Sequence, residues 1–323
     1  MEFDLSSITA NLFAISMNPF ILFISGVLLL YYSSETIINN SILISEKYNV
    51  SKLLIGIFIL AVGTSLPELF VSIIAILKES PSIVLGNIIG SNITNIGFVF
   101  GLVVLFNPIS SNPNKNLYYN SVYLFFATIL FVFFLNDGDL IKFEGILLVL
   151  LCAVYLFMLI FKFNKVDNVE NHKNNKISLL KTVLMLLLGF TFIYIGSEFF
   201  VVGALGISEF LGVEDLAIGM TIVSLGTSAP ELFTSIIAIR NKEKNLVIGN
   251  LIGSNIFNIL LIGGIASIVK NIYIEFSALS VNCLFLIFIT LLFIISILVF
   301  KKINRLIGVA FIIIYLFFLN VNF

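Results

Sequence analysis

An internal duplication without gaps constrains this chain more than any other feature. The hexapeptide Gly-Thr-Ser-Leu-Pro-Glu at 63–68 recurs as Gly-Thr-Ser-Ala-Pro-Glu at 226–231. The offset of 163 residues, the separation of Glu68 and Glu231, holds far beyond this peptide. From Gly26 to Ile96, roughly half of the positions are identical to those one offset later. The chain is therefore two copies of one unit.

Both copies are strongly apolar. Hydrophobic residues make up 59% of the chain, and the mean hydropathy is +1.14, which excludes an ordinary soluble domain. The apolar runs are long enough for helices of about 20 residues, and they lack the period-two alternation of membrane strands. The sequence therefore predicts an all-α polytopic membrane protein with the lipid bilayer as its solvent.

The apolar segments form two sets of five, so ten transmembrane helices are expected. The first set is 18–44, 53–77, 82–106, 118–135 and 144–163, and the second is 178–206, 216–240, 246–268, 277–299 and 304–321. The predicted domains are an amphipathic N-terminal lead-in at 1–16, a first five-helix repeat at 17–163, a cytoplasmic linker at 164–177 and a second repeat at 178–323.

The charges predict how the repeats lie in the membrane. Because five is odd, the second copy enters from the opposite side, which is the inverted-repeat plan of secondary transporters. Of the 17 lysines and arginines, all but Lys78, Lys142 and Lys270 fall on the side of the linker. The positive-inside rule then places the linker in the cytoplasm and both termini outside a cell membrane.

The repeated hexapeptide has the composition of a cation site. Glu68 and Glu231 lie in apolar segments, where an ionisable residue is a functional candidate by default. Each follows a proline, which cannot bond to the carbonyl four residues earlier. Those carbonyls belong to Gly63 and Gly226, and broken backbone at membrane depth is tolerated where it lines a cavity.

A polar stripe follows each hexapeptide on the next expected helix. Its members are spaced by four, so they share one helix face; they are Asn87, Ser91 and Asn95, and then Asn250, Ser254 and Asn258. One such stripe could simply hold helices together, but a doubled stripe beside two acids favours ion binding. Carboxylates, hydroxyls and carbonyls form an all-oxygen site that suits Ca²⁺.

The two blocks Gly-Thr-Ser-x-Pro-Glu and Gly-Asn-x-Ile-Gly-Ser-Asn resemble the alpha-repeats of the sodium/calcium exchangers, in the calcium/cation antiporter superfamily. The short linker resembles prokaryotic, archaeal-type members. The resemblance implies ten helices in two inverted halves with four central cation sites. It also implies Ca²⁺ ligands at Glu68, Glu231, Thr64 and Thr227. The implied Na⁺ sites use Ala61, Ser65, Ser91, Asn95, Ser224, Ser228, Ser254 and Asn258.

Two positions depart from the expected prokaryotic pattern. Asn258 stands where a close relative or a potassium-dependent exchanger would carry Asp, which argues against potassium co-transport and leaves the site charge at −2. Ser224 stands where Ala is common, and its hydroxyl could retune one Na⁺ site. A third repeated feature, the acids Glu35 and Glu198, could line the ion access path or bond to neighbouring helices.

The expected function is Na⁺/Ca²⁺ antiport by alternating access, electrogenic with three Na⁺ for each Ca²⁺, through the first and sixth helices sliding past the core. A Ca²⁺/H⁺ antiporter on the same fold is the alternative, because carboxylates can bind protons; a channel fits the prolines less well. No catalytic arrangement indicates an enzyme, no basic face indicates nucleic-acid binding, and no cofactor is expected. The expected partners are the transported Ca²⁺ and Na⁺ and the bilayer, with a monomer as the assembly.

Overall fold

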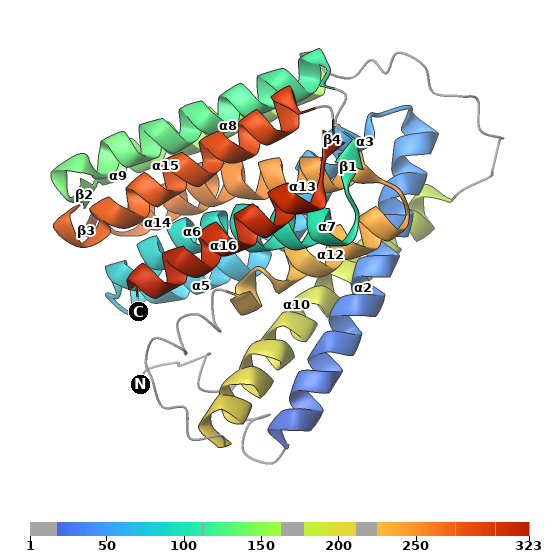
Figure 1. The fold of residues 1–323 in the computed structure, drawn as a ribbon. Helices are drawn as coiled ribbons and strands as arrows, with labels where there is room; N and C mark the ends of the chain where they lie inside the picture. Colours follow the sequence, from blue (N-terminus) through green and yellow to red (C-terminus); the bar gives the residue numbers. More distant parts are fainter. Residues whose placement is uncertain are drawn as a thin grey trace.

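The computed structural model describes residues 18–110, 113–162, 178–210, 225–274, 276–300 and 302–322. They form an all-helical bundle (Figure 1). The first repeat contains α2 (Pro19–Tyr48), α3 (Lys52–Ile55), η1 (Gly56–Leu60), α4 (Ala61–Thr64), α5 (Leu66–Leu77), α6 (Pro81–Thr94), η2 (Asn95–Phe100), α7 (Gly101–Phe106), α8 (Lys115–Phe134), η3 (Leu135–Asp137) and α9 (Lys142–Lys162). The second contains α10 (Leu179–Phe210), α12 (Ala229–Arg240), α13 (Lys244–Phe257), η4 (Asn258–Ile262), α14 (Gly263–Val269), α15 (Phe276–Val299) and α16 (Arg305–Asn322).

The described helices agree with the expected spans. Seven of them are long and apolar enough to cross a membrane, or eight if the bent pair Lys52–Thr64 and Leu66–Leu77 counts as one span. The other two expected spans correspond to the shorter apolar helix α16 and to α12, whose preceding residues 211–224 lie outside the described ranges. The predicted lead-in at 1–16 and linker at 164–177 also lie outside them.

Local signals in the sequence explain where several helices begin. Asn18 caps α2 by accepting a hydrogen bond from the backbone N–H of Phe20, and Asn114 caps α8 through the N–H of Leu117. Proline occupies the first turn of α2, α5, α6 and α12, where its missing N–H costs no helical bond. The turns that separate the spans are therefore encoded locally.

Equivalent helices of the two repeats run in opposite directions. Helices α2 and α10 lie side by side (Figure 1). A Cβ on Gly203 would meet Phe23, whereas one on Gly189 would meet Ile37, so residue numbers rise along one helix as they fall along the other. These glycines allow the two backbones to approach closely. The antiparallel contact shows the inversion of the repeats directly.

A second glycine contact repeats with the 163-residue offset. Gly101 of α7 packs against Gly308 of α16, and Gly264 of α14 packs against Gly145 of α9. In each case, a Cβ on one glycine would lie within 3.1 Å of the carbonyl oxygen of the other. The same backbone crossing is thus built twice, once for each pairing of the halves.

The described connections contain four short strands that the apolar pattern did not predict. β1 (Ile109–Ser110) pairs antiparallel with β4 (Lys302–Ile303), and β2 (Asp139–Leu140) pairs antiparallel with β3 (Ile272–Tyr273). These two pairings are also related by the offset. Each pairs a strand of one repeat with a strand of the other, so the repeats are joined at both ends of the bundle.

Polar contacts join the loops between helices at each end of the bundle. At the end where α9 finishes and α10 begins, which we call the linker side, Lys52 forms an ion pair with Glu243, and Lys244 bonds to the carbonyl of Ser110 at 2.5 Å. At the opposite end, Lys270 bonds to Glu79 at 2.6 Å, and this contact lowers the pKa of the exposed Glu79 carboxyl. Lys52 and Lys244 thus lie at one end and Lys270 at the other, as the distribution of lysine and arginine in the sequence predicted.

Candidate functional site

Two broken helices meet at the centre of the bundle. The backbone leaves the helical conformation at Ser65 (φ −85°, ψ 7°), between α4 and α5, and at Ser228 (φ −85°, ψ 3°), before α12. The axes bend by 41° at the first break. Glu68 and Glu231 lie in the first turns that follow, where the positive end of the helix dipole favours a carboxylate. The predicted break and the acids therefore coincide.

Close packing brings the polar stripe of α13 against the first broken helix. A Cβ on Gly253 would lie 2.6 Å from the Cβ of Ala61 and 2.9 Å from the Cα of Ile57, so only glycine allows this approach. As a result, the hydroxyl of Thr64 lies 3.3 Å from Asn250 Oδ1 and 3.5 Å from Ser254 Oγ. Side chains of the two repeats thus form one polar layer.

Glu231 connects the two halves at this layer. Its Oε1 accepts hydrogen bonds from Ser254 of its own repeat, at 3.1 Å, and from Ser65 of the first repeat, at 3.4 Å. Its Oε2 has no hydrogen-bond partner among the described residues. The side chain is fully buried, so one carboxylate oxygen is held in place and the other remains available to a ligand.

Glu68 has no hydrogen bond to either carboxylate oxygen within the described part of the chain, although it is only 1% exposed. Burying polar oxygens without partners is costly, and such groups require an explanation. The backbone around Glu68 is nonetheless fixed, because Asn87 Nδ2 donates to the Glu68 carbonyl at 3.0 Å and to Ser72 Oγ at 2.9 Å. A cation between the two repeats would satisfy the free oxygens.

Further unpartnered polar atoms belong to the predicted site residues. Both side-chain polar atoms of Asn95 and Asn258, and the hydroxyl of Ser228, have no hydrogen-bond partner among the described residues. Asn95 and Asn258 open the π-helices η2 and η4. Such wide turns within α-helices are frequent at functional sites. The oxygens among these atoms are available to a cation, as are those of the carboxylates.

The structure buries eleven of the twelve predicted ion ligands at or beside the two breaks and stripes. These are Ala61, Thr64, Ser65, Glu68, Ser91, Asn95, Thr227, Ser228, Glu231, Ser254 and Asn258. Ser224, the twelfth, lies outside the described residues. Ser91 differs from its counterpart Ser254 because it donates to Asn87 Oδ1, at 3.4 Å, and not to an acid.

Three residues outside the predicted ligand set support the site. Asn87 and Asn250 belong to the recognised stripes, and their spacing of four already placed them on the ligand face. Asn250 donates to Thr234 Oγ1 at 3.2 Å, and Thr234 donates to the carbonyl of Pro230 at 2.7 Å. The position equivalent to Thr234 in the first repeat is Val71, so the duplication gave no signal for it.

The carbonyl of Gly226, which was expected to be free beside the carboxylates, has a hydrogen-bond partner. The break does free the Gly226 carbonyl from its helix, but the hydroxyl of Ser197 on α10 donates to this oxygen at 2.8 Å. Glu35 and Glu198 lie apart from the polar layer; Glu35 is half-buried and Glu198 exposed. Neither forms a hydrogen bond or ion pair with another described residue.

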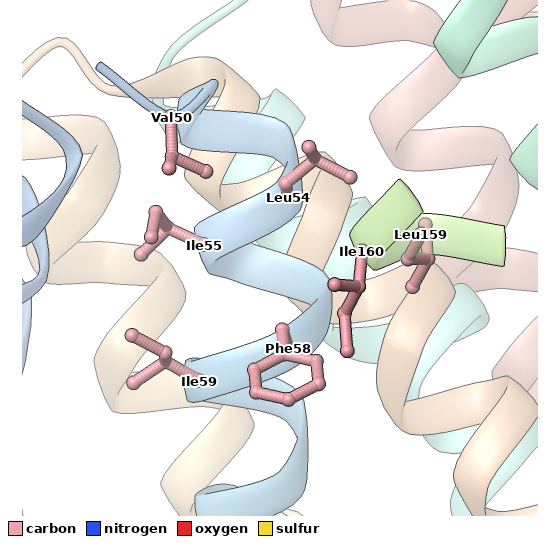
Figure 2. A pocket seen from close by; sticks show the side chains of 7 residues that line it. All are labelled: Val50, Leu54, Ile55, Phe58, Ile59, Leu159 and Ile160. Atoms are coloured by element: carbon pink, nitrogen blue, oxygen red, sulfur yellow. The ribbon is translucent and has the colours of Figure 1, made fainter. Parts of the chain in front are cut away.

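The apolar groove between η1 and α9 is separate from this site. Its volume is about 170 Å³, and Phe58, Ile59, Leu159 and Ile160 are among the side chains that line it (Figure 2). Phe58 and Ile160 are each 44% exposed, as expected for a surface that faces lipid. The described residues also contain no group of three His, Cys, Asp or Glu side chains that could hold a metal ion.

Comparison with known proteins identifies the family. The profile of the sodium/calcium exchanger protein family matches residues 18–161 and 181–323. The sodium/calcium exchanger MaX1 of Methanosarcina acetivorans is 31% identical, over 94% of this chain and 98% of the relative. CaxA of Alkalimonas amylolytica, named as an antiporter, is 34% identical over 76% of this chain and 78% of its own.

A solved structure shows the same fold. The sodium–calcium exchanger NCX_Mj, soaked with 2.5 mM Na⁺ and 0.1 mM Ca²⁺, superposes with a TM-score of 0.81 at 34% identity, and the match covers 93% of this chain and 98% of that one. Together with the double family match and the two inverted repeats, this similarity classifies the chain as a transporter and not an enzyme. The chain belongs to the sodium/calcium exchanger family.

Proposed function

We propose that this protein exchanges Na⁺ for Ca²⁺ across the membrane by alternating access. The observation that supports it best is the pair of buried carboxylates, Glu68 and Glu231, whose three unpartnered oxygens lie where two inverted broken helices meet. Such midplane sites between inverted repeats are typical of secondary transporters. The relatives described above bear sodium/calcium exchanger names, which agrees with this choice of ions.

In the proposed assignment, Ca²⁺ is bound by Glu68 and Glu231 with the carbonyls of Thr64 and Thr227. Oxygen ligands of this kind are those that Ca²⁺ prefers. The remaining hydroxyls and amides provide the Na⁺ sites, from Ala61, Ser65, Ser91 and Asn95 in the first repeat and from Ser224, Ser228, Ser254 and Asn258 in the second. Buried oxygens without partners at Asn95, Ser228 and Asn258 support this assignment.

A Ca²⁺/H⁺ antiporter is the second candidate. Glu68 has no hydrogen-bond donor among the described residues, so a proton could take the place of Na⁺ on its carboxyl group. The similarity to CaxA, an antiporter by name, does not identify the coupling ion. The dense set of hydroxyls and amides around the acids favours Na⁺ over H⁺, because a proton needs none of these ligands.

The two candidates differ in the gradient that drives Ca²⁺ uptake. Proteoliposomes containing the protein are expected to accumulate Ca²⁺ when an outward Na⁺ gradient is imposed, and not when an outward H⁺ gradient of the same size replaces it. Liposomes without protein give the background leak. Uptake that follows the H⁺ gradient and ignores Na⁺ would overturn the proposal in favour of Ca²⁺/H⁺ exchange.

We also propose that the linker side is cytoplasmic and both termini are extracellular. The structure groups Lys52, Arg240 and Lys244 on the linker side, and positive charge is retained in the cytoplasm. Single cysteines at Asn171, in the linker, and at Asp137 are expected to react with an impermeant thiol reagent from opposite sides, Asn171 from the cytoplasm. The native Cys152 and Cys283 are buried and provide a low background. Reaction of both labels from one side would contradict the topology.

A further inference from the structure

Helices α2 and α10 form a pair that is distinct from the rest of the bundle. They pack along each other at Gly26, Gly196 and Gly203, where backbones meet without intervening side chains. In Figure 1 the pair crosses the other helices at a steep angle. Helix α2 also packs along α12, which leads from Glu231 to the linker side. Opening a path along α12 to the enclosed acids from that side would separate α2 from α12.

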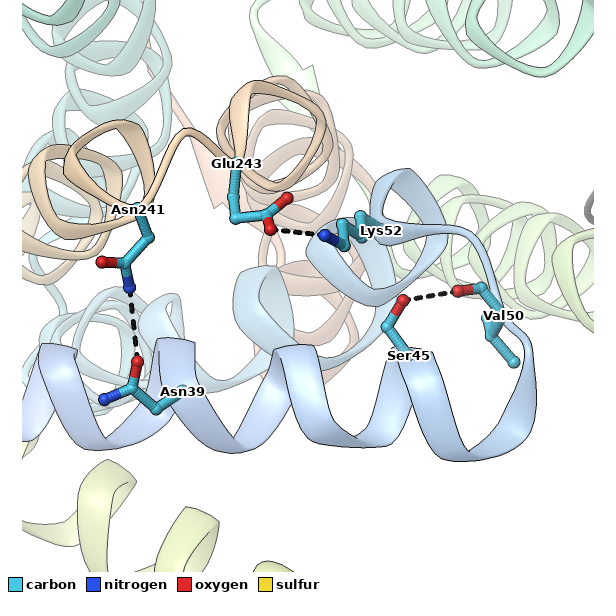
Figure 3. A network of polar contacts seen from close by, with 6 residues as sticks. All are labelled: Asn39, Ser45, Val50, Lys52, Asn241 and Glu243. Atoms are coloured by element: carbon cyan, nitrogen blue, oxygen red, sulfur yellow. Dashed lines mark hydrogen bonds and ion pairs between the residues drawn. The ribbon is translucent and has the colours of Figure 1, made fainter. Parts of the chain in front are cut away.

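Three polar contacts oppose this movement. Arg240, at the end of α12, donates to the hydroxyl of Tyr31 on α2. Asn241, which caps the end of α12, donates from Nδ2 to Asn39 Oδ1 of α2 at 3.3 Å (Figure 3). The third contact is the ion pair of Lys52 with Glu243, whose side chains are 33% and 16% exposed.

The ion pair is linked to α2 through a hydrogen-bonded turn. Helix α2 ends with Asn49 in the left-handed conformation (φ 57°). Beyond it, the backbone N–H of Val50 donates to the Ser45 carbonyl at 3.0 Å, and Ser45 Oγ donates to the Val50 carbonyl at 2.7 Å. Figure 3 shows this turn beside Lys52 and Glu243. Holding Lys52 on Glu243 therefore also holds the end of α2.

The duplication does not repeat the side chains that form these contacts. One offset away from Arg240, Asn241 and Glu243 stand Leu77, Lys78 and Ser80, and Val202 takes the place of Asn39. Tyr194 corresponds to Tyr31, but its ring packs edge-on against Phe70, with ring centroids 5.6 Å apart. These described side chains cannot form the same hydrogen bonds or the same ion pair, so the latch residues could not be found from the internal repeat.

We propose that the contacts Tyr31–Arg240, Asn39–Asn241 and Lys52–Glu243 form a latch that keeps the cation site closed on the linker side. The latch rests on the proposed alternating access. By holding α2 against the end of α12, it disfavours the states that are open to the linker side. Each contact is partly exposed and individually weak. Together they set the resting balance between the two open states.

The test measures access from each side. Ser235 lies one helical turn from Glu231 toward the linker side, and Ser72 lies one turn from Glu68 toward the opposite side; both are buried. In the Ser235→Cys and Ser72→Cys proteins, the rate of reaction with an impermeant thiol reagent reports opening of the respective side. Adding Tyr31→Phe and Asn39→Val removes both acceptors from α2. This should raise the Ser235→Cys rate roughly tenfold, the effect of losing one or two hydrogen bonds, and lower the Ser72→Cys rate.

Controls separate a latch from general loosening. Tyr194→Phe, the equivalent change on α10, should leave both rates unchanged. Glu243→Gln should open the linker side, and the double exchange Lys52→Glu with Glu243→Lys should close it again. Unchanged rates in the Tyr31→Phe, Asn39→Val protein, or a rise from both sides, would overturn the latch. These rates do not depend on which ion is carried, so they remain readable if the gradient experiment refutes Na⁺ coupling.

Discussion

Replacing Glu68 or Glu231 with glutamine is expected to abolish Ca²⁺ transport while leaving the protein folded. Each change keeps the shape of the side chain but removes one of the two charges proposed to neutralise Ca²⁺. At contact distance within a protein this charge contributes on the order of 3 kcal/mol, or about 100-fold in binding. The measurement is Na⁺-dependent Ca²⁺ uptake by each variant in proteoliposomes, compared at equal protein content.

Thermal unfolding distinguishes a lost ligand from a damaged fold. Ca²⁺ at about 100 times its Kd should stabilise the unmodified protein by about 2.7 kcal/mol, and the glutamine variants should lose this increment while keeping their stability without Ca²⁺. Glu35→Gln is the matched control, because it changes a half-buried glutamate away from the polar layer. Near-normal uptake by either Glu68→Gln or Glu231→Gln would refute the ligand assignment.

The second large effect expected is a dependence of transport on membrane potential. With Glu68 and Glu231 ionised and Asn258 neutral, the site carries −2, so bound Ca²⁺ brings it to zero and three bound Na⁺ bring it to +1. One net charge then crosses in each cycle. A charge crossing the full field is driven by about 2.3 kcal/mol per 100 mV, which corresponds to about a 50-fold change in the equilibrium Ca²⁺ ratio.

The potential can be set independently of the Na⁺ gradient. Potassium gradients with valinomycin clamp the vesicles, and an inside-negative potential should favour Na⁺ entering and Ca²⁺ leaving. Vesicles with the same Na⁺ gradient and no potential serve as the reference. If flux ignores the potential, two Na⁺ must be exchanged for each Ca²⁺, and the third Na⁺ site of the proposal would be wrong.

The sequence predicted the features of the fold that are set by local chemistry. Long apolar runs predicted the helices, and Pro67 and Pro230 predicted the breaks, because a helix that continued through either proline would lack one backbone hydrogen bond. Because the offset between Glu68 and Glu231 is constant along the repeat, each candidate residue around Glu68 predicted an equivalent one around Glu231. The odd number of spans gave the inversion, which the antiparallel packing of α2 and α10 confirms.

The features that could not be predicted depend on contacts across the membrane or on the difference between the repeats. The hydrogen bond from Ser197 to Gly226 connects two spans with no pattern shared between them. Ser65 was expected only as a Na⁺ ligand. Its hydroxyl also donates to Glu231 of the other repeat, a contact that depends on how the two halves pack. Arg240 on Tyr31 breaks the internal symmetry, so the duplication, which was the strongest signal in the sequence, gave no indication of it.

The pairing of strands from different repeats affects how the chain folds while it is being synthesised. β1 emerges from the ribosome early but pairs with β4, which lies close to the end of the described chain, and β2 pairs with β3. Contacts so distant in sequence form slowly because loop closure comes first. Throughout synthesis, the first repeat therefore carries Glu68 before the second repeat is present to enclose it. Until the second repeat is inserted, nascent chains of this exchanger depend on lipid, water or the insertion machinery to shield Glu68.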